Sequence, residues 1–436
     1  MRTPSFLVAL LAAAVTALAQ EPSIDLAEAS RAFESAKSAS DLDAGRLWDT
    51  EIYGPVFLVD PQTRFVAADR SDPGGVLTAR DGVWTGTLPQ SINPANTAIE
   101  WAGLEWTMVL WPPPTIPHAR NRLLLHEMFH RVQDKIGLPA NNPLNAHLDT
   151  RDGRIWMRLE MRALAEALSH GGEARRSAIR DALDFRALRR GLFPGAAADE
   201  DGLERNEGMA EYTGLVLGGL PTAALAHRAA VGLEQQEARE TFSRSFAYAT
   251  GPAYGVLLDA SGRSWREALV GGATLTELLE ASYAPEVSRV PAEGRVAGYN
   301  GERVIAIETA RDEARLAREA ELRERFVDGP LLLMVPGSEF SFSFDPNDAF
   351  NLAGIGTVYG TTRVVDGWGV LEVESGGGLF RRNEEGMITG VAVPVPSGAA
   401  TPPTAGGGWR LELAPGWEIV PGDRAGDWVV RATTTP

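Results

Sequence analysis

The chain has 436 residues, a formal net charge of -17 at pH 7 and no cysteine. A chain of this length has room for roughly two or three domains, each with its own hydrophobic core. The acidic balance and the absence of a block of basic residues argue against nucleic acid and anionic membranes as partners. Without cysteine, neither a disulfide bond nor a lipid attached through a thiol can form.

The first segment has the composition of a secretory signal peptide. Arg2 gives it a basic start, an apolar run rich in Leu, Val and Ala follows, and Ala17 and Ala19 occupy the small-residue positions before a cleavage site. The apolar run is shorter and richer in alanine than a membrane anchor, and no later segment approaches the length of a membrane span. The sequence therefore predicts a signal peptide over 1–19, an exported protein that is periplasmic or secreted, and no stable membrane anchor.

A polar, partly helical lead-in is predicted over 20–49, and short strands follow it. The strands are rich in β-branched and aromatic residues and are separated by Asp-Pro, Asp-Gly and Pro turn signals. They are predicted within 52–60, 64–69, 82–89, 97–103 and 104–111. We expect these runs to form one small sheet that leads directly into a helix.

That helix is predicted from Pro117 to Gly137. Apolar residues recur at helical spacing, Pro117 lies in the first turn, and Gly137 ends the pattern. Residues 126–130 within it read His-Glu-Met-Phe-His, which is an H-E-x-x-H motif. Because residues four apart lie on one face of a helix, the two imidazoles are expected to converge on a single metal ion.

The residue types in this motif fit the chemistry of a zinc hydrolase. His126 and His130 supply two zinc ligands, and Glu127 lies about 100° around the helix from His126, beside the metal. That is the position expected of a general base. The alternative is a buried helix with two hydrogen-bonded histidines. However, an apolar helix that buries His and Glu needs a partner for these groups, and a metal ion supplies one.

The rest of the chain divides into a helical part and a β part. Helices are predicted at 155–169, 174–191, 203–218, 222–240, 246–259 and 305–326, the last with alternating Arg and Glu on a solvated face. The pattern beyond Gly329 is that of strands and predicts a small all-β sandwich or barrel. The predicted fold is thus α+β, with an N-terminal sheet and helices over 50–300, a connecting helix over 301–328 and a β domain over 329–436.

A catalytic zinc site needs a third protein ligand and an open position for water. A third histidine in the pattern H-E-x-x-H-x-x-G-x-x-H is ruled out, because Gln133 and Ile136 occupy the glycine and histidine positions. The preferred candidate is Glu207, in the run Asn-Glu-Gly-Met-Ala-Glu-Tyr over 206–212. Glu211 shares its helix face and can accept the outer N–H of a ligating histidine.

Other assignments of the third ligand remain open. Glu160 and Asp149 are the next candidates, and Glu204, Glu207 and Glu211 could instead form an acidic stripe that faces solvent. Small residues on the helix of Glu207 favour close approach by another helix, as expected of an element that belongs to a buried site.

The runs HEMFH and NEGMAEY resemble the paired motifs of the gluzincins, the thermolysin-like and aminopeptidase N-like zinc peptidases. The resemblance covers roughly residues 50–285. The segment 131–206 between the motifs is much longer than in the best-known members, and the G-A-M-E-N exopeptidase signature is absent. The resemblance implies a zincin-like catalytic domain, Zn²⁺ as cofactor, a peptide or protein substrate and Glu127 as the general base.

A second run, 246–259, resembles the Y-x-x-G helix of the aminopeptidase N-like enzymes. In that family the tyrosine stabilises the developing oxyanion, and Tyr248 with Gly251 matches the pattern, with Tyr254 as the alternative. An extended peptide substrate can add to the edge of a sheet by backbone pairing. The strand near Thr107–Trp111 is predicted to be that edge.

Two further functions remain open at this level. One is a zincin-like binding protein without catalysis, whose function lies in the C-terminal β domain; the presence of Glu127 argues against it. The other is a zinc hydrolase of non-peptide substrates, because H-E-x-x-H specifies the metal and the water but not the acyl group that is attacked.

Overall fold

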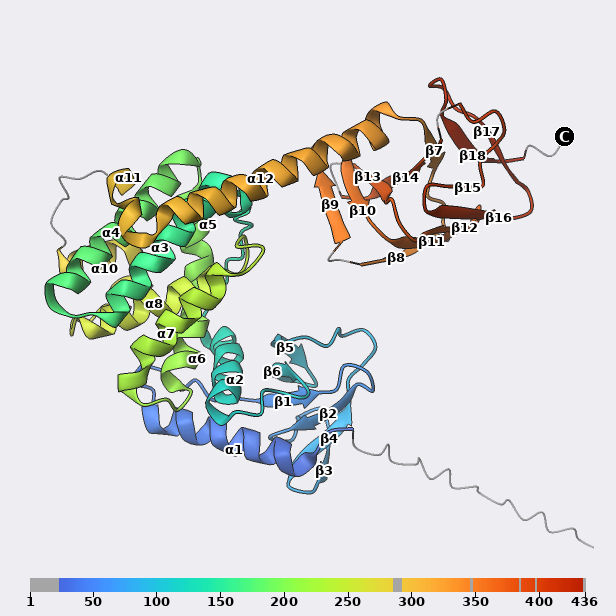
Figure 1. Cartoon of the computed structure of the whole chain (residues 1–436). Coiled ribbons are helices and arrows are strands. Elements are labelled where there is room, and N and C mark those ends of the chain that lie inside the picture. Colours follow the sequence, from blue (N-terminus) through green and yellow to red (C-terminus); the bar gives the residue numbers. More distant parts are fainter. Residues whose placement is uncertain (1–22, 285–291, 346–347, 384–385, 397, 434–436) are drawn as a thin grey trace, which may run out of the picture. The chain divides into compact units, whose positions relative to one another are not determined.

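The computed structural model describes residues 23–284, 292–345, 348–383, 386–396 and 398–433. The chain divides into two compact units, Met1–Glu308 and Thr309–Pro436 (Figure 1). The boundary falls inside the helix α12 (Gly301–Arg323), which lies within the connecting helix predicted over 301–328. The predicted signal peptide, 1–19, lies outside the described residues.

The first unit begins with helix α1 (Leu26–Asp43) and a six-stranded sheet of order β3-β4-β2-β1-β6-β5. β1 and β6 are parallel, and the other neighbours are antiparallel. Each predicted strand run contains a strand, and β3 adds one that was not predicted. The bounds are β1 Val56–Val59, β2 Phe65–Ala68, β3 Thr78–Arg80, β4 Val83–Thr87, β5 Thr97–Trp101 and β6 Leu104–Leu110.

The free edge of this sheet is not the predicted one. β6, which contains most of the predicted edge, is covered on both sides by β1 and β5, so that β5 forms the edge. Ala102 and Gly103, with φ of 50° and 84°, form a two-residue turn that folds β5 onto β6. The prediction was wrong because it did not recognise this Ala-Gly pair as a hairpin turn.

Helices make up the remainder of the first unit. α2 packs against β5 and β6 on one side and against α6 on the other, between the sheet and the other helices (Figure 1). Each predicted helix is present, and α5, together with the π-helical turn η2, was not predicted as a separate element. The bounds are α2 Pro117–Val132, η1 Ala146–Asp149, α3 Arg151–Ser169, α4 Gly172–Leu192, α5 Ala196–Leu203, η2 Glu204–Gly208, α6 Met209–Leu217, α7 Thr222–Glu237, α8 Ala247–Ala260, α9 Arg266–Val270, α10 Leu275–Tyr283, α11 Ala292–Arg295 and η3 Val296–Tyr299.

One hydrophobic core joins these elements. It includes Phe33 of α1, Leu58 of β1, Leu125 of α2 and Tyr212 of α6. Because one face of α1 is buried in this core, the lead-in predicted over 20–49 contributes a helix to the first unit. Burial of apolar side chains from all these elements fixes α2 and α6 side by side.

The second unit consists of two sheets that share one hydrophobic core. The larger has order β17-β18-β7-β14-β13-β10-β9, and the smaller has order β15-β16-β12-β11-β8. An N-terminal sheet with helices and a C-terminal β domain confirm the mixed class predicted from the sequence. The bounds are η4 Glu324–Asp328, β7 Leu331–Met334, β8 Ser341–Phe344, β9 Ala349–Leu352, β10 Gly356–Tyr359, β11 Thr362–Asp366, β12 Gly369–Val373, β13 Gly378–Arg382, β14 Ile388–Pro394, β15 Ala405–Gly406, β16 Trp409–Leu413, β17 Trp417–Pro421 and β18 Trp428–Ala432.

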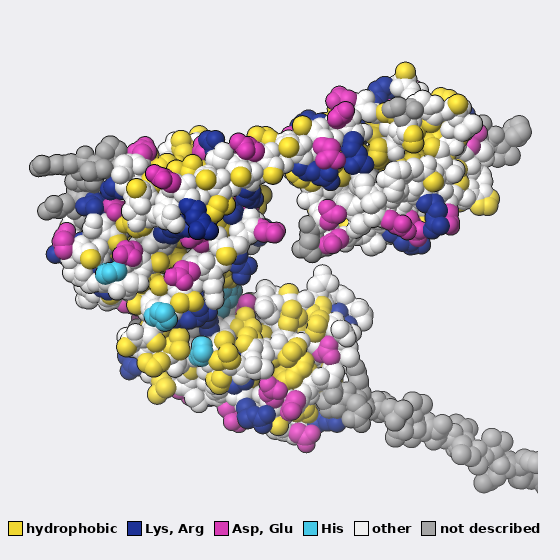
Figure 2. All heavy atoms as spheres, in the orientation of Figure 1, with side chains coloured by type: hydrophobic (Ala, Val, Ile, Leu, Met, Phe, Trp, Pro, Cys, Tyr) yellow, Lys and Arg dark blue, Asp and Glu magenta, His cyan; other side chains and the backbone are white. Residues whose placement is uncertain are grey.

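The surface is mixed in charge. Figure 2 shows acidic and basic side chains interspersed on the visible face of each unit. Within the described ranges, no helix combines the length and the apolar character that crossing a bilayer requires.

Candidate metal centre

Helix α2 brings the two histidines of the motif to one point. Pro117 begins the helix, and Leu125 and Phe129 bury its apolar face. His126 and His130 then project from the same face, with their Nε2 atoms 3.2 Å apart. This placement is the local consequence of four-residue spacing on a helix.

Glu207 approaches the same point from a second element. It lies in the π-helical turn η2, and its Oε2 is 3.4 Å from Nε2 of His126 and 3.5 Å from Nε2 of His130. The neighbouring Glu204 enters the core and pairs with Arg186. With Glu204 only 1% exposed, the three glutamates of this segment do not form a solvent-facing stripe. A π turn is a local widening of a helix that recurs at functional sites.

The three ligand atoms fit one zinc ion. In a tetrahedral site with bonds of about 2.0–2.1 Å, two ligand atoms lie about 3.3–3.4 Å apart. The sides of the triangle formed by His126, His130 and Glu207 are 3.2, 3.4 and 3.5 Å. Among the described residues these three side chains form a group able to hold a metal ion. The geometry and the ligand types both match a zinc site with an open fourth position.

The outer nitrogen of each histidine has an acceptor. Nδ1 of His126 donates to Oε2 of Glu211 at 2.7 Å, and Nδ1 of His130 donates to Oε1 of Gln133 at 2.8 Å. These contacts place the proton on Nδ1 and leave the Nε2 lone pair directed at the metal position. Glu211 also forms an ion pair with Arg122.

A chain of hydrogen bonds joins the two ligand-bearing segments. Gln133, which is 2% exposed, donates from Nε2 to Oδ1 of Asn206 at 2.9 Å. Asn206 then donates from Nδ2 to Oε1 of Glu207 at 3.2 Å. His130 and Glu207 are thus oriented by one connected network of buried side chains, which rigidifies the ligand set.

The charges at the centre favour a cation. Burial lowers the pKa of His126, but hydrogen bonds to Glu207 and Glu211 outweigh this and raise it to about 10. Burial opposes ionisation of Glu207, yet the hydrogen bonds from His126, His130 and Tyr248 bring its pKa well below the usual range. Either a proton or a metal ion can supply the positive charge that these carboxylates stabilise. The two compete for the same side chains.

Glu127 stands beside the triangle without a partner. Its side chain is 7% exposed and, among the described residues, makes no hydrogen bond or ion pair. Burial raises the pKa of Glu127, although His126 and His130 act in the opposite direction. A buried carboxylate that makes no hydrogen bond and whose pKa is raised is suited to act as a proton acceptor.

Tyr248 covers the other side of the centre. It comes from α8, and its hydroxyl donates to Oε2 of Glu207 at 2.6 Å. Its ring stacks on His126 with centroids 5.5 Å apart and planes 10° apart. Burial and the contact with Glu207 raise the pKa of Tyr248, so that the phenol remains a neutral donor. The structure thus brings Tyr248 to the histidines and Glu207.

The alternative residues lie elsewhere. Glu160 is fully buried and pairs with Arg186 and Arg189, and the hydroxyl of Tyr254 donates to it at 3.1 Å. Asp149 accepts from the hydroxyl of Thr241 and from the backbone N–H of Phe242. These carboxylates hold the helices and loops together and do not reach the histidines.

The segments that carry Glu207 and Tyr248 meet through glycine. A Cβ atom on Gly251 of α8 would overlap the backbone of Gly208, and one on Gly214 of α6 would overlap the carbonyl of Arg122 in α2. The small residues of this segment therefore do allow close helix approach, as the sequence suggested.

Sequence reasoning missed Arg122, Gln133 and Asn206. Local signals for them exist, since Arg122 precedes His126 by four residues, Gln133 follows His130 by three, and Asn206 adjoins Glu207. Comparison of the chain with protein-family models, with curated proteins and with solved structures finds no match. Any function assigned to this chain therefore rests on the geometry and chemistry of the centre.

Proposed function

We propose that the protein is an exported, zinc-dependent metallopeptidase of the gluzincin type, in which His126, His130 and Glu207 bind the metal. The observation that carries the proposal is the triangle of two Nε2 atoms and one carboxylate oxygen, with sides of 3.2–3.5 Å. Its support is the unpartnered Glu127 beside that triangle. A binding protein without catalysis has no need of a buried, unpartnered carboxylate at this place.

The side chains at the centre provide the chemical groups that hydrolysis of an acyl bond requires. A bound zinc ion would lower the pKa of a water molecule toward neutrality and polarise the scissile carbonyl. Glu127 accepts a proton from the attacking water as its oxygen bonds to the carbonyl carbon. Tyr248 donates a hydrogen bond to the carbonyl oxygen as negative charge develops there. Glu127 then gives the proton to the nitrogen of the breaking peptide bond, and a carboxylate and an amine are released.

The substrate chain is placed along β5. This strand forms one edge of the sheet, and α2, which carries the histidines, packs against it. An extended peptide can add to such an edge through backbone hydrogen bonds. β5 therefore takes the role that the sequence assigned to Thr107–Trp111.

Removal of metal tests the proposal directly. Purified protein is expected to contain about one zinc ion per chain and to cleave casein or short peptides. Activity should disappear with a chelator and return when zinc is added back. Absence of zinc even after addition would refute the metal site. Bound zinc without cleavage of any peptide would indicate a hydrolase that acts on other acyl groups. Cell-wall fragments would then be the next substrates to test.

Tyr248→Phe is expected to lower turnover by roughly a hundredfold while zinc content and substrate affinity stay nearly unchanged. The reason is that the hydroxyl acts on charge that develops only in the transition state. Steady-state kinetics on the best peptide would measure the effect. Tyr254→Phe is the matched control, because that hydroxyl contacts Glu160 in the core. Unchanged turnover in Tyr248→Phe would remove it from the mechanism.

A further inference from the structure

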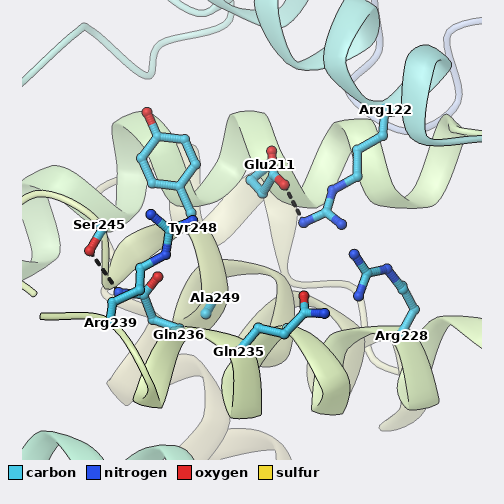
Figure 3. Close-up of a pocket in the computed structure, with 10 residues that line it drawn as sticks. Arg122, Glu211, Arg228, Gln235, Gln236, Arg239, Ser245, Tyr248 and Ala249 are labelled. Atoms are coloured by element: carbon cyan, nitrogen blue, oxygen red, sulfur yellow. Dashed lines mark hydrogen bonds and ion pairs between the residues drawn. The ribbon is translucent and has the colours of Figure 1, made fainter. Parts of the chain in front are cut away.

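A pocket of about 370 Å³ opens next to the candidate metal centre. Arg122 of α2, Arg228 of α7 and Arg239 contribute to its lining, with Glu211 and Tyr248 from the centre itself. Figure 3 shows Arg122 and Arg228 at one end of the pocket and Arg239 and Tyr248 at the other. The same two residues, Glu211 and Tyr248, thus contact the metal centre on one side and line the pocket on the other.

The pocket is basic, whereas the chain as a whole has a formal net charge of -17. Among the described residues that line it, Glu211 alone is acidic, and it already accepts from His126 and pairs with Arg122. Arg228 and Arg239 make no side-chain hydrogen bond or ion pair with any described residue. Nε of Arg122 is buried and also lacks a partner. The lining therefore carries excess positive charge and unused donors.

This excess charge is partly removed from water. Arg239 is exposed, but Arg228 is half-buried. Burial, together with the neighbouring Arg122, lowers the pKa of Arg228, while its guanidinium remains charged. Guanidinium groups in this setting bind carboxylates through charge-assisted, often bidentate, hydrogen bonds. A cleft lined by one sign of charge also concentrates ligands of the opposite sign.

We propose that this pocket binds a carboxylate of the peptide substrate at one of its two unpaired guanidinium groups, Arg228 or Arg239, and thereby sets the specificity of cleavage. The inference rests on the proposed function, because Tyr248, which contacts Glu207 at the metal centre, also lines the pocket. The carboxylate has two possible sources, the free C-terminus of a peptide or the side chain of Asp or Glu. The first source would make the enzyme prefer bonds near a C-terminus, and the second would make it prefer acidic residues.

Two pairs of peptides separate these sources. One pair differs only in a free or amidated C-terminus, and the other, with amidated C-termini, differs only in Glu or Gln at one position. Wild-type kcat/KM is expected to favour the charged member of one pair by about tenfold or more. A preference in the first pair assigns the C-terminal carboxylate, and a preference in the second assigns the side chain.

Arg228→Gln combined with Arg239→Gln is expected to abolish this preference by slowing cleavage of the charged peptide alone. Because neither side chain has a partner to lose, the fold should be retained, which circular dichroism would verify. Arg31→Gln combined with Arg303→Gln is the matched control for net charge, since Arg31 is exposed on α1 and Arg303 is exposed on α12. Equal kcat/KM for both members of both pairs in the wild type, or a preference that survives the double substitution, would overturn the proposal.

Binding measured without hydrolysis tests the carboxylate-binding pocket independently of the proposed peptidase function. Titration calorimetry of the metal-free protein with the same peptides should show tighter binding of the charged member, lost in the double variant and weakened by salt. Charge-selective binding in a protein that cleaves no peptide would retain the pocket and reject the peptidase. Cleavage without charge selectivity in either assay would retain the peptidase and reject the pocket.

Discussion

Glu127→Gln is expected to retain zinc and to lose peptide hydrolysis by a factor of about 10³ or more, because general acid–base catalysis typically contributes 10²–10⁴-fold. The amide has nearly the shape of the carboxylate but cannot accept the proton of the attacking water. Since Glu127 makes no hydrogen bond or ion pair with any described residue, the substitution breaks no polar contact, and the amide fills the same buried space. Zinc content and turnover measured on one preparation would show the two effects separately.

The control for this substitution is Glu234→Gln on an exposed position of α7, which changes the net charge equally. It should leave both zinc content and turnover unchanged. Turnover close to that of the wild type in Glu127→Gln, with zinc bound, would exclude Glu127 as the general base. It would then favour a water molecule activated by the metal and Tyr248 alone.

Glu207→Ala is expected to lose the metal. A ligand is removed outright, so the affinity for zinc should fall by more than the roughly 10–100-fold that loss of an outer contact to a ligand costs. The two histidines remain, held by Glu211 and Gln133, so weak residual binding of zinc would not contradict the proposed ligand set. Metal analysis after gel filtration, followed by a competitive zinc titration, would measure the loss.

Glu160→Ala provides the contrast, because Glu160 was the next candidate for the third ligand. In the structure it neutralises Arg186 and Arg189 in the core. Its removal leaves two buried guanidinium groups short of a partner and should lower the free energy of unfolding by about 3–5 kcal/mol, with zinc retained in the folded fraction. If Glu207→Ala retained its full zinc content and a folded Glu160→Ala lost it, Glu160 and not Glu207 would be the third zinc ligand.

The part of the centre that depends on local periodicity could be predicted from the sequence. Four-residue spacing on one helix is enough to pair His126 with His130 and to place Glu127 beside them. The same reasoning put Glu207 and Glu211 on one face of a second helix. That this face meets the histidines was predicted from the need for a third zinc ligand and was supported by the family resemblance, because nothing in the spacing of two distant motifs specifies their contact.

Contacts between residues that are far apart in the sequence could be identified only from the structure. Gln133 and Asn206 are buried partners from different helices, and each is an ordinary polar residue in its own helix. The π-helical turn that separates the environments of Glu204 and Glu207 has no pattern that distinguishes it from an α-helix. The sheet edge was missed because Ala-Gly, unlike Asn-Gly or Asp-Gly, is a weak sign of a two-residue hairpin turn.

The separation of the Glu207 carboxylate from the Tyr248 phenol is set at Gly208 and Gly251, two residues that supply no atom to the chemistry. Because backbone meets backbone there, no side chain is available to repack when one of them is enlarged. A Cβ atom on Gly251 would lie 2.3 Å from Cα of Gly208, so the two backbones would have to move apart, and Glu207 and Tyr248 with them. The geometry of the candidate centre thus depends on positions that a survey of charged and aromatic residues would pass over, and the two glycines belong in any sequence signature used to search for similar centres.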